Sequence, residues 1–200
     1  MLFRSKYQLN KPALQKLRRD LVIRLRALPI LKAKETALRL ELLKSQARLV
    51  KLTADEKRMR QQSDAYVKLW TEYPGLLSIE EIRLAERSVA GVPVAEVADI
   101  RFNVLKAGLF HQRGWVVKGT DVLRGMVRLR VELDIHRKNT LVLHDARKRA
   151  TQKVNLYEKV QIPQLSGAIR RIRNFLDDKE NLSRAAQKIV KEKNRQAVNA

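Results

Sequence analysis

The 200-residue sequence predicts a mainly helical protein, in which N- and C-terminal helices form a long antiparallel two-helix coiled coil. A small central region with a β-hairpin joins them. Residues 13–70 contain one Pro and no Gly and are rich in good helix formers. Tyr73-Pro74-Gly75 ends that segment, and a helical pattern resumes after Thr120. We therefore divide the chain into an N-terminal helix (1–72), a central region (73–120) and a C-terminal helix (121–200).

The N-terminal helix, expected over 11–70, has its apolar residues in steps of three and four. The first set is Leu14, Leu17, Leu21, Leu25, Leu28 and Leu31. The register then reads Glu35, Leu38, Leu42, Ser45, Leu49, Leu52, Glu56, Met59, Ser63, Tyr66 and Trp70. This spacing is typical of a coiled-coil seam. Pro29 is expected to bend or interrupt the helix, because it lacks an amide donor and crowds the preceding turn.

The central region is expected to hold the hairpin at 80–103. Two short strands would lie around Ile82 and Leu84, and around Val92, Val94 and Val97, with Ala90-Gly91 as the turn. Pro93 indicates that the second strand is an edge strand or begins late.

The C-terminal helix, expected over 121–198, starts with Thr120 or Asp121 as its cap. Its stripe begins with Val122, Met126, Leu129 and Leu133, and Pro163 and Gly167 predict a kink. Neither helix can bury its stripe alone, so the chain is expected to double back on itself. The predicted seam consists of Leu38, Leu42, Leu49, Leu52, Leu165, Ile169, Ile172 and Leu176.

The formal net charge of +22 lies in the two ends of the chain. Residues 1–60 hold 17 basic and five acidic residues, residues 61–120 hold seven of each, and residues 121–200 hold 19 and nine. Such a chain is expected to meet nucleic acid, an anionic membrane or an acidic protein surface. No apolar stretch approaches the length of a membrane span.

Residues that would carry chemistry are sparse. There is no Cys, and His111, His136 and His144 are not spaced as ligands on one helical turn. No Gly-rich phosphate loop occurs. We expect no catalytic, cofactor-binding or metal site. Arg147-Lys148-Arg149 and the basic run at 170–173 could bind phosphates, but no aromatic stacking platform accompanies them. A solvated basic face and a nucleic-acid-binding coiled coil therefore both stay open, and a membrane-surface scaffold is a weaker alternative.

Several motifs resemble the D subunit of V-type and A-type ATPases. The run Lys153-Val154-Asn155-Leu156-Tyr157-Glu158, followed by Ile162-Pro163-Gln164-Leu165, resembles the C-terminal signature of that family. The segments at 14–21 and 31–38 are similar to its paired Leu-Lys motifs, and Ser88–Val94 is similar to its central Gly-containing segment. The resemblance covers nearly the whole chain in the same order.

This resemblance implies the central rotor shaft of a rotary ATPase, which is a non-catalytic component without cofactor. The two helices would stand inside the catalytic hexamer of A and B subunits, and the neutral middle would meet the F subunit and the coupling C subunit. The chain would lie on the cytoplasmic face, attached to the membrane only through the complex, with no direct nucleic acid. Val154, Asn155, Ile162 and Pro163 match the family motif and would shape the kinked middle of the C-terminal helix. Arg170, Arg171 and Arg173 are candidate contacts to the hexamer wall.

Overall fold

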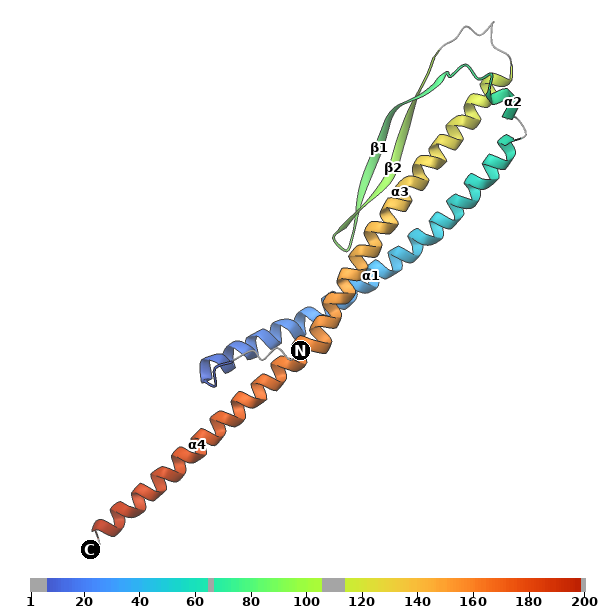
Figure 1. Ribbon diagram of the computed structural model, residues 1–200. Coiled ribbons are helices and arrows are strands. Elements are labelled where there is room, and N and C mark those ends of the chain that lie inside the picture. Colours follow the sequence, from blue (N-terminus) through green and yellow to red (C-terminus); the bar gives the residue numbers. More distant parts are fainter. Residues whose placement is uncertain (1–6, 65–66, 106–113, 199–200) are drawn as a thin grey trace. The chain divides into compact units, whose positions relative to one another are not determined.

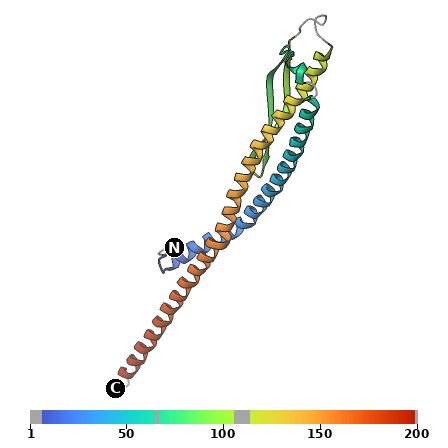
Figure 2. The ribbon, with the colours of Figure 1, turned by 45° about the vertical axis from the view of Figure 1, so that its right-hand side comes forward.

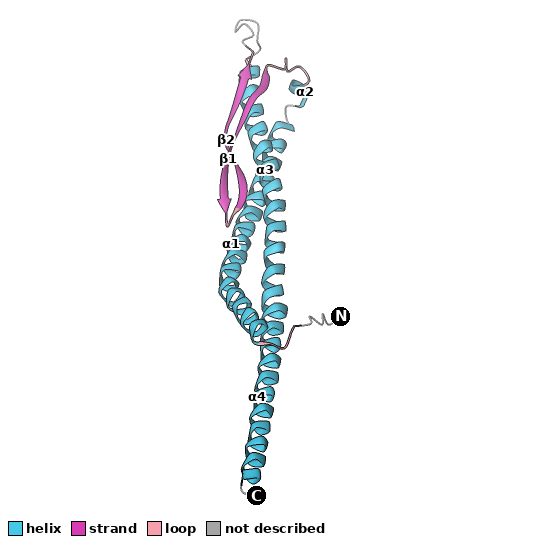
Figure 3. Ribbon diagram, turned by 90° about the vertical axis from the view of Figure 1, so that its left-hand side faces the viewer, coloured by secondary structure: helices cyan, strands magenta, loops and turns pink. Residues whose placement is uncertain are grey.

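The computed structural model describes residues 7–64, 67–105 and 114–198. The elements follow in the order α1 (Lys11–Asp64), α2 (Val67–Trp70), β1 (Leu77–Val89), β2 (Val92–Val104), α3 (Trp115–Asn155), a π-helical turn η2 (Leu156–Gln161) and α4 (Ile162–Val198) (Figure 1, Figure 3). The predicted class is confirmed: long helices at both ends of the chain and an antiparallel hairpin between them. None of the described helices has a stretch long and apolar enough to cross a membrane.

The chain divides into two compact units, one made of Met1–Ala33 with Thr151–Ala200 and the other of Lys34–Ala150. In the first unit, Leu14 and Leu17 of α1 are buried against Leu165, Ala168 and Ile172 of α4. Asn10 caps α1, since its Oδ1 accepts the Ala13 N–H at 2.9 Å. The two segments run antiparallel: Leu14 and Leu17 pack with residues 165–172, whereas Arg24, later in α1, bonds the earlier residue Gln161.

The second unit packs the hairpin on an antiparallel pair formed by α1 and α3. Its buried core contains Leu38 and Leu42 of α1, Val94 of β2, and Leu143 and Ala150 of α3. The hairpin lies along α3 in both views (Figure 1, Figure 2). This core explains the fold of the unit: the stripe of each helix is covered by the other helix and by the hairpin.

The stripe of α1 keeps one register from Leu14 to Ser63. The less exposed positions of this stripe follow in alternating steps of three and four: 14, 17, 21, 24, 28, 31, 35, 38, 42, 45, 49, 52, 56, 59 and 63. The sequence predicts Leu25 in this stripe, but it is 50% exposed and Arg24 takes its place. Pro29 lies inside α1 without interrupting it. Tyr66, expected in the same stripe, lies outside the described residues, as does His111.

The hairpin is longer than the two short strands that the sequence predicts. β1 and β2 have 13 residues each, and register shifts occur between Ile79 and Glu81 and between Arg83 and Leu84. The predicted turn is present: Ala90 has φ of 50° and Gly91 has φ of 76°. Two residues with positive φ form the kind of turn whose twist matches an antiparallel hairpin.

The second long helix begins at Trp115 and not at Thr120. Gly119 precedes the predicted helix, because glycine has a low helix propensity, yet it lies inside α3. A Cβ at Gly119 would lie 3.3 Å from the Trp115 ring and 3.4 Å from the Trp70 ring. Gly119 thus allows these rings to pack closely, which outweighs its low helix propensity. Val122, expected in the stripe, is exposed.

Candidate functional site

The eight seam residues predicted from sequence lie at helix faces that pack within the two units. In the second unit, Leu38, Leu42 and Leu52 are buried and Leu49 is half-buried. In the first unit, Leu165 and Ile172 are buried, while Ile169 and Leu176 pack partly buried against their cluster. The two sets belong to separate cores, because Leu38 and Leu42 pack with α3 and Leu165 and Ile172 pack with the start of α1.

The four motif residues bracket the π-helical turn. Val154 and Asn155 are the last residues of α3, and Ile162 and Pro163 are the first residues of α4. The Ile162 N–H donates to the Tyr157 carbonyl, five residues earlier. Pro163 follows at once, and its ring would crowd a carbonyl four residues earlier in a regular α-helix. The wider turn gives the chain room for this proline.

The turn also corrects the register of the helix. Less exposed positions in α3 follow at 133, 136, 140, 143, 147, 150, 154 and 157, in alternating steps of three and four. The next ones, 161 and 165, are two successive steps of four. The π-helical turn absorbs this extra residue, so that Leu165 still faces the α1 stripe. From the sequence we predict only a kink at this place. The two successive steps of four could have indicated the extra residue.

Two polar contacts join α1 to the turn within the first unit. Arg24 Nε donates to Gln161 Oε1 at 2.7 Å, and Lys32 Nζ donates to Glu158 Oε1 at 2.7 Å. These two contacts lie on either side of Pro29. They connect the α1 segment that contains this proline to the irregular turn, and Arg24 occupies the stripe position that the sequence predicts for Leu25.

The three candidate partner-facing arginines lie on the surface of α4. Arg170, Arg171 and Arg173 are exposed, and none of them makes a hydrogen bond or an ion pair with a described residue. Ile172 lies between two of them in sequence and is buried. α4 therefore presents apolar residues to α1 and free guanidinium groups to solvent.

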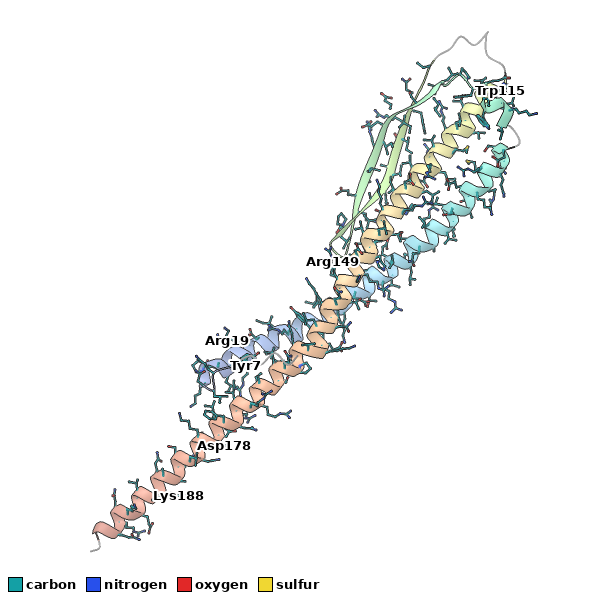
Figure 4. The ribbon with its side chains drawn as sticks, in the orientation of Figure 1. Tyr7, Arg19, Trp115, Arg149, Asp178 and Lys188 are labelled. Atoms are coloured by element: carbon teal, nitrogen blue, oxygen red, sulfur yellow. The ribbon has the colours of Figure 1, made fainter. Side chains whose placement is uncertain are left out.

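The last part of α4 has no covering segment among the described residues. Every position from Asp177 to Gln196 is exposed, including the apolar Leu182, Ile189 and Val190 (Figure 4). Asp178 and Lys188 mark this stretch in Figure 4. A helix with exposed apolar residues and many Lys and Arg residues can contact a partner protein through both kinds of side chain.

Two polar contacts inside the second unit are not predicted from the sequence. Ser45 Oγ and Thr140 Oγ1 lie 2.8 Å apart across the helix pair. Asn139 Nδ2 donates to the Ala95 carbonyl at 2.6 Å, and Asn139 Oδ1 accepts the Ala95 N–H at 3.2 Å. The amide of Asn139 thereby holds the edge of β2 on α3. No sequence spacing signals this contact, because it joins a helix to a strand 44 residues away.

Charged groups attach the other strand to α1. Arg87 of β1 donates to Glu41 of α1 and, at 3.0 Å, to Glu96 of β2. The hydrogen bond to Glu41 raises the pKa of Arg87. Burial lowers the pKa of His136, an effect increased by the nearby Arg48 and opposed by Glu132 and Glu96. His136 thus favours its neutral form between the helices and the hairpin.

An aromatic group lies where α2 ends and α3 begins. The rings of Trp70 and Trp115 meet edge to face with centroids 6.3 Å apart, and Trp115 marks the start of α3 in Figure 4. Tyr73 Oη lies 3.0 Å from Thr120 Oγ1, and the Thr120 hydroxyl also donates to the Val116 carbonyl. Thr120, expected as a helix cap, therefore lies inside α3 and joins it to the chain after α2.

Comparisons with known proteins agree over nearly the full length. Residues 13–192 match the protein family described as the D subunit of ATP synthase. The chain is also similar to the V-type ATP synthase D subunit of Borreliella burgdorferi, with 26% identity over 190 residues that cover 94% of each chain. The matched region contains the whole hairpin and nearly all of the long helices.

Proposed function

Because the chain belongs to the ATP synthase D subunit family, we propose that it forms the central rotor shaft of a V-type ATP synthase. It would transmit torque between the catalytic hexamer of A and B subunits and the ion-translocating membrane ring. The chemistry would take place in the hexamer, and this chain would change the conformations of its subunits in turn. Such coupling between distant sites needs a rigid connecting element.

The observation that supports this role most directly is the pairing of long helices along apolar stripes within each of the two units. α1 keeps one register over its whole packed length, and the π-helical turn restores the register of the second helix. A shaft under torque resists twisting because side chains of one helix are held between those of the other. Polar cross-links such as Arg24–Gln161 and Lys32–Glu158 add directional contacts.

The proposed partners follow from the charge and exposure of the surface. The exposed tail of α4 and the arginines Arg170, Arg171 and Arg173 would face the inner wall of the A and B hexamer. The neutral middle of the chain would lie towards the membrane and meet the F subunit and the coupling C subunit. The chain would therefore be a peripheral component on the cytoplasmic face, held to the membrane only through the complex.

Reconstitution tests this function. The purified chain is expected to join A, B and F subunits at physiological salt and to restore coupled ATP hydrolysis. Replacing Arg170, Arg171 and Arg173 together by Gln is expected to weaken assembly or coupling. Replacing Lys44, Lys51 and Lys57 by Gln removes the same charge from exposed positions of the second unit and serves as the matched control. Failure of the native chain to assemble, together with tight salt-sensitive binding to DNA or RNA, would contradict the proposal.

A further inference from the structure

The hairpin has two edges, and Asn139 occupies the edge of β2. Its side-chain amide bonds both the N–H and the carbonyl of Ala95, so both backbone groups of Ala95 point away from β1. Ala95 is paired with Glu86 in the register of the hairpin. In an antiparallel ladder such a pair makes no hydrogen bonds across the strands. The N–H and carbonyl of Glu86 therefore point outward from the free edge of β1.

The same orientation extends along β1. The extra residues of the two register shifts are Glu80 on β1 and Ala98 on β2, so β1 is regular from Glu81 to Val89. Alternate residues of a regular strand direct their backbone groups to the same side. The backbone N–H and carbonyl groups of Ile82, Leu84 and Ser88 hence point outward, as those of Glu86 do. No described residue bonds this edge, and β1 is exposed from Ser78 to Ser88.

An apolar row accompanies the open edge. Ile79, Ile82 and Leu84 of β1 are cross-strand partners of Phe102, Ile100 and Val97, so the six side chains lie on one face of the hairpin. The β2 members are buried or half-buried, whereas the β1 members are 47%, 40% and 52% exposed. The covered apolar face thus continues onto β1, where no described residue covers it.

The charge of the hairpin is opposite to that of the chain. Residues 77–104 contain five acidic and three basic residues, although the chain carries +22. All three arginines, Arg83, Arg87 and Arg101, are paired with glutamates. Glu80, Glu86 and Asp99 form no ion pair with a described residue. Basic side chains on a partner would complement these three carboxylates.

We propose that the free edge of β1 accepts an extended strand from another component of the synthase, one that carries apolar side chains to meet Ile82 and Leu84 and a Lys or Arg on the same face to meet Glu86. This inference rests on the proposed function, because it places the chain in that assembly. Backbone hydrogen bonds would attach the strand, and the row at Ile79, Ile82 and Leu84 would contact its apolar side chains. A second copy of this chain fits poorly, because its own β1 would bring the same glutamates against the edge.

Amide hydrogen exchange in the full complex tests the proposal. The outward amides of Leu84 and Glu86 are expected to slow by about tenfold or more on assembly, because a bonded amide exchanges only when it opens. Arg83, Ala85 and Arg87 already bond β2 and serve as internal controls. Fast exchange at Leu84 and Glu86 in an assembled complex would overturn this inference and leave the proposed rotor function in place. Absence of assembly would overturn the rotor function and this inference with it. Slowing of these two amides in the purified chain as it dimerises would assign the edge to a second copy and also overturn it.

Two variants of Glu86 distinguish the contribution of the backbone edge to binding from that of the side-chain charge. Glu86→Pro removes an outward N–H without removing a hydrogen bond to β2. Strands tolerate proline at an edge position whose N–H faces solvent. This variant is expected to reduce the affinity of the chain for the other subunits while circular dichroism and exchange at Arg83 stay unchanged. Glu86→Gln keeps the N–H and is expected to retain the protection of Leu84. Equal affinity of Glu86→Pro and the native chain would contradict strand addition.

Discussion

Ser45 of α1 and Thr140 of α3 join their hydroxyl groups across the helix pair, 2.8 Å apart, at a buried position of an otherwise largely apolar stripe. Thr140 donates its own proton to the His136 carbonyl at 2.8 Å. Ser45 must therefore be the donor between the two helices. This contact fixes the register of the pair, because only one alignment brings the two hydroxyls together.

Replacing Ser45 by Ala tests that contact. The variant is expected to lose about 1 kcal/mol of unfolding free energy, the usual net contribution of one hydrogen bond. Urea denaturation followed by circular dichroism measures the loss. Thr53→Ala is the control, because Thr53 is an exposed residue on the same helix whose hydroxyl donates to the Leu49 carbonyl of its own helix. Equal losses in both variants would show that Ser45 contributes nothing specific.

Leu38 and Leu40 offer a matched pair on one helix. Leu38 is fully buried in the core of the second unit, and Leu40 is 56% exposed. Leu38→Ala is expected to lower the unfolding free energy by about 2–5 kcal/mol, because it leaves a cavity in a packed core. Leu40→Ala is expected to change it by less than about 0.5 kcal/mol. Similar effects of the two substitutions, measured by urea denaturation, would contradict the assigned face of α1.

The π-helical turn predicts that the protein tolerates the deletion of one residue beside it. Removing Gln164 in a Pro163→Ala background restores alternating steps of three and four, so α4 is expected to keep its contacts with α1 and its stability. Removing Val142 in the same background turns Leu143 and Ala150 away from the core. That deletion is expected to cost about 2–5 kcal/mol or more, as for the loss of a buried leucine. Gln164 and Val142 are both exposed, so neither loss removes packing by itself. Equal destabilisation in urea denaturation would show that the turn does not correct the register.

His136 predicts a dependence of stability on pH. Its ordinary pKa is 6.5, and burial lowers the pKa in the folded protein. Between these two values the unfolded chain binds more protons, so stability falls as the pH decreases through this range. His136→Gln is expected to remove that part of the pH dependence, and the exposed His144→Gln is the control. Arg48, Glu132 and Glu96 face the ring and remain in both variants. An unchanged pH dependence in His136→Gln would contradict this assignment.

Much of the fold could be predicted from the sequence, because long helices carry a strong periodic signal. The positions from Leu38 to Ser63 follow from spacing alone, and Ala90-Gly91 indicates the turn of the hairpin. Arg24 could not be identified in place of Leu25, because only the structure shows its bond to Gln161. The start of α3 could not be located because Gly119 serves the packing of Trp70 and Trp115, which propensity does not report.

The candidate site could be predicted less completely. The motif residues Val154, Asn155, Ile162 and Pro163 stand out in the sequence, but the π-helical turn between them depends on register and backbone hydrogen bonding together. The contact of Asn139 with Ala95 depends on the tertiary structure alone. Free arginines such as Arg170 have no local signal that distinguishes a partner contact from a solvated charge.

Rotation of a single complex tests the central claim most directly. The chain contains no Cys, so Gln61→Cys introduces one thiol at an exposed position near the end of α1. A bead attached there, with the A and B hexamer fixed to a surface, is expected to rotate in one direction when ATP is supplied. A bead that stays still while the same complexes hydrolyse ATP would contradict the shaft function.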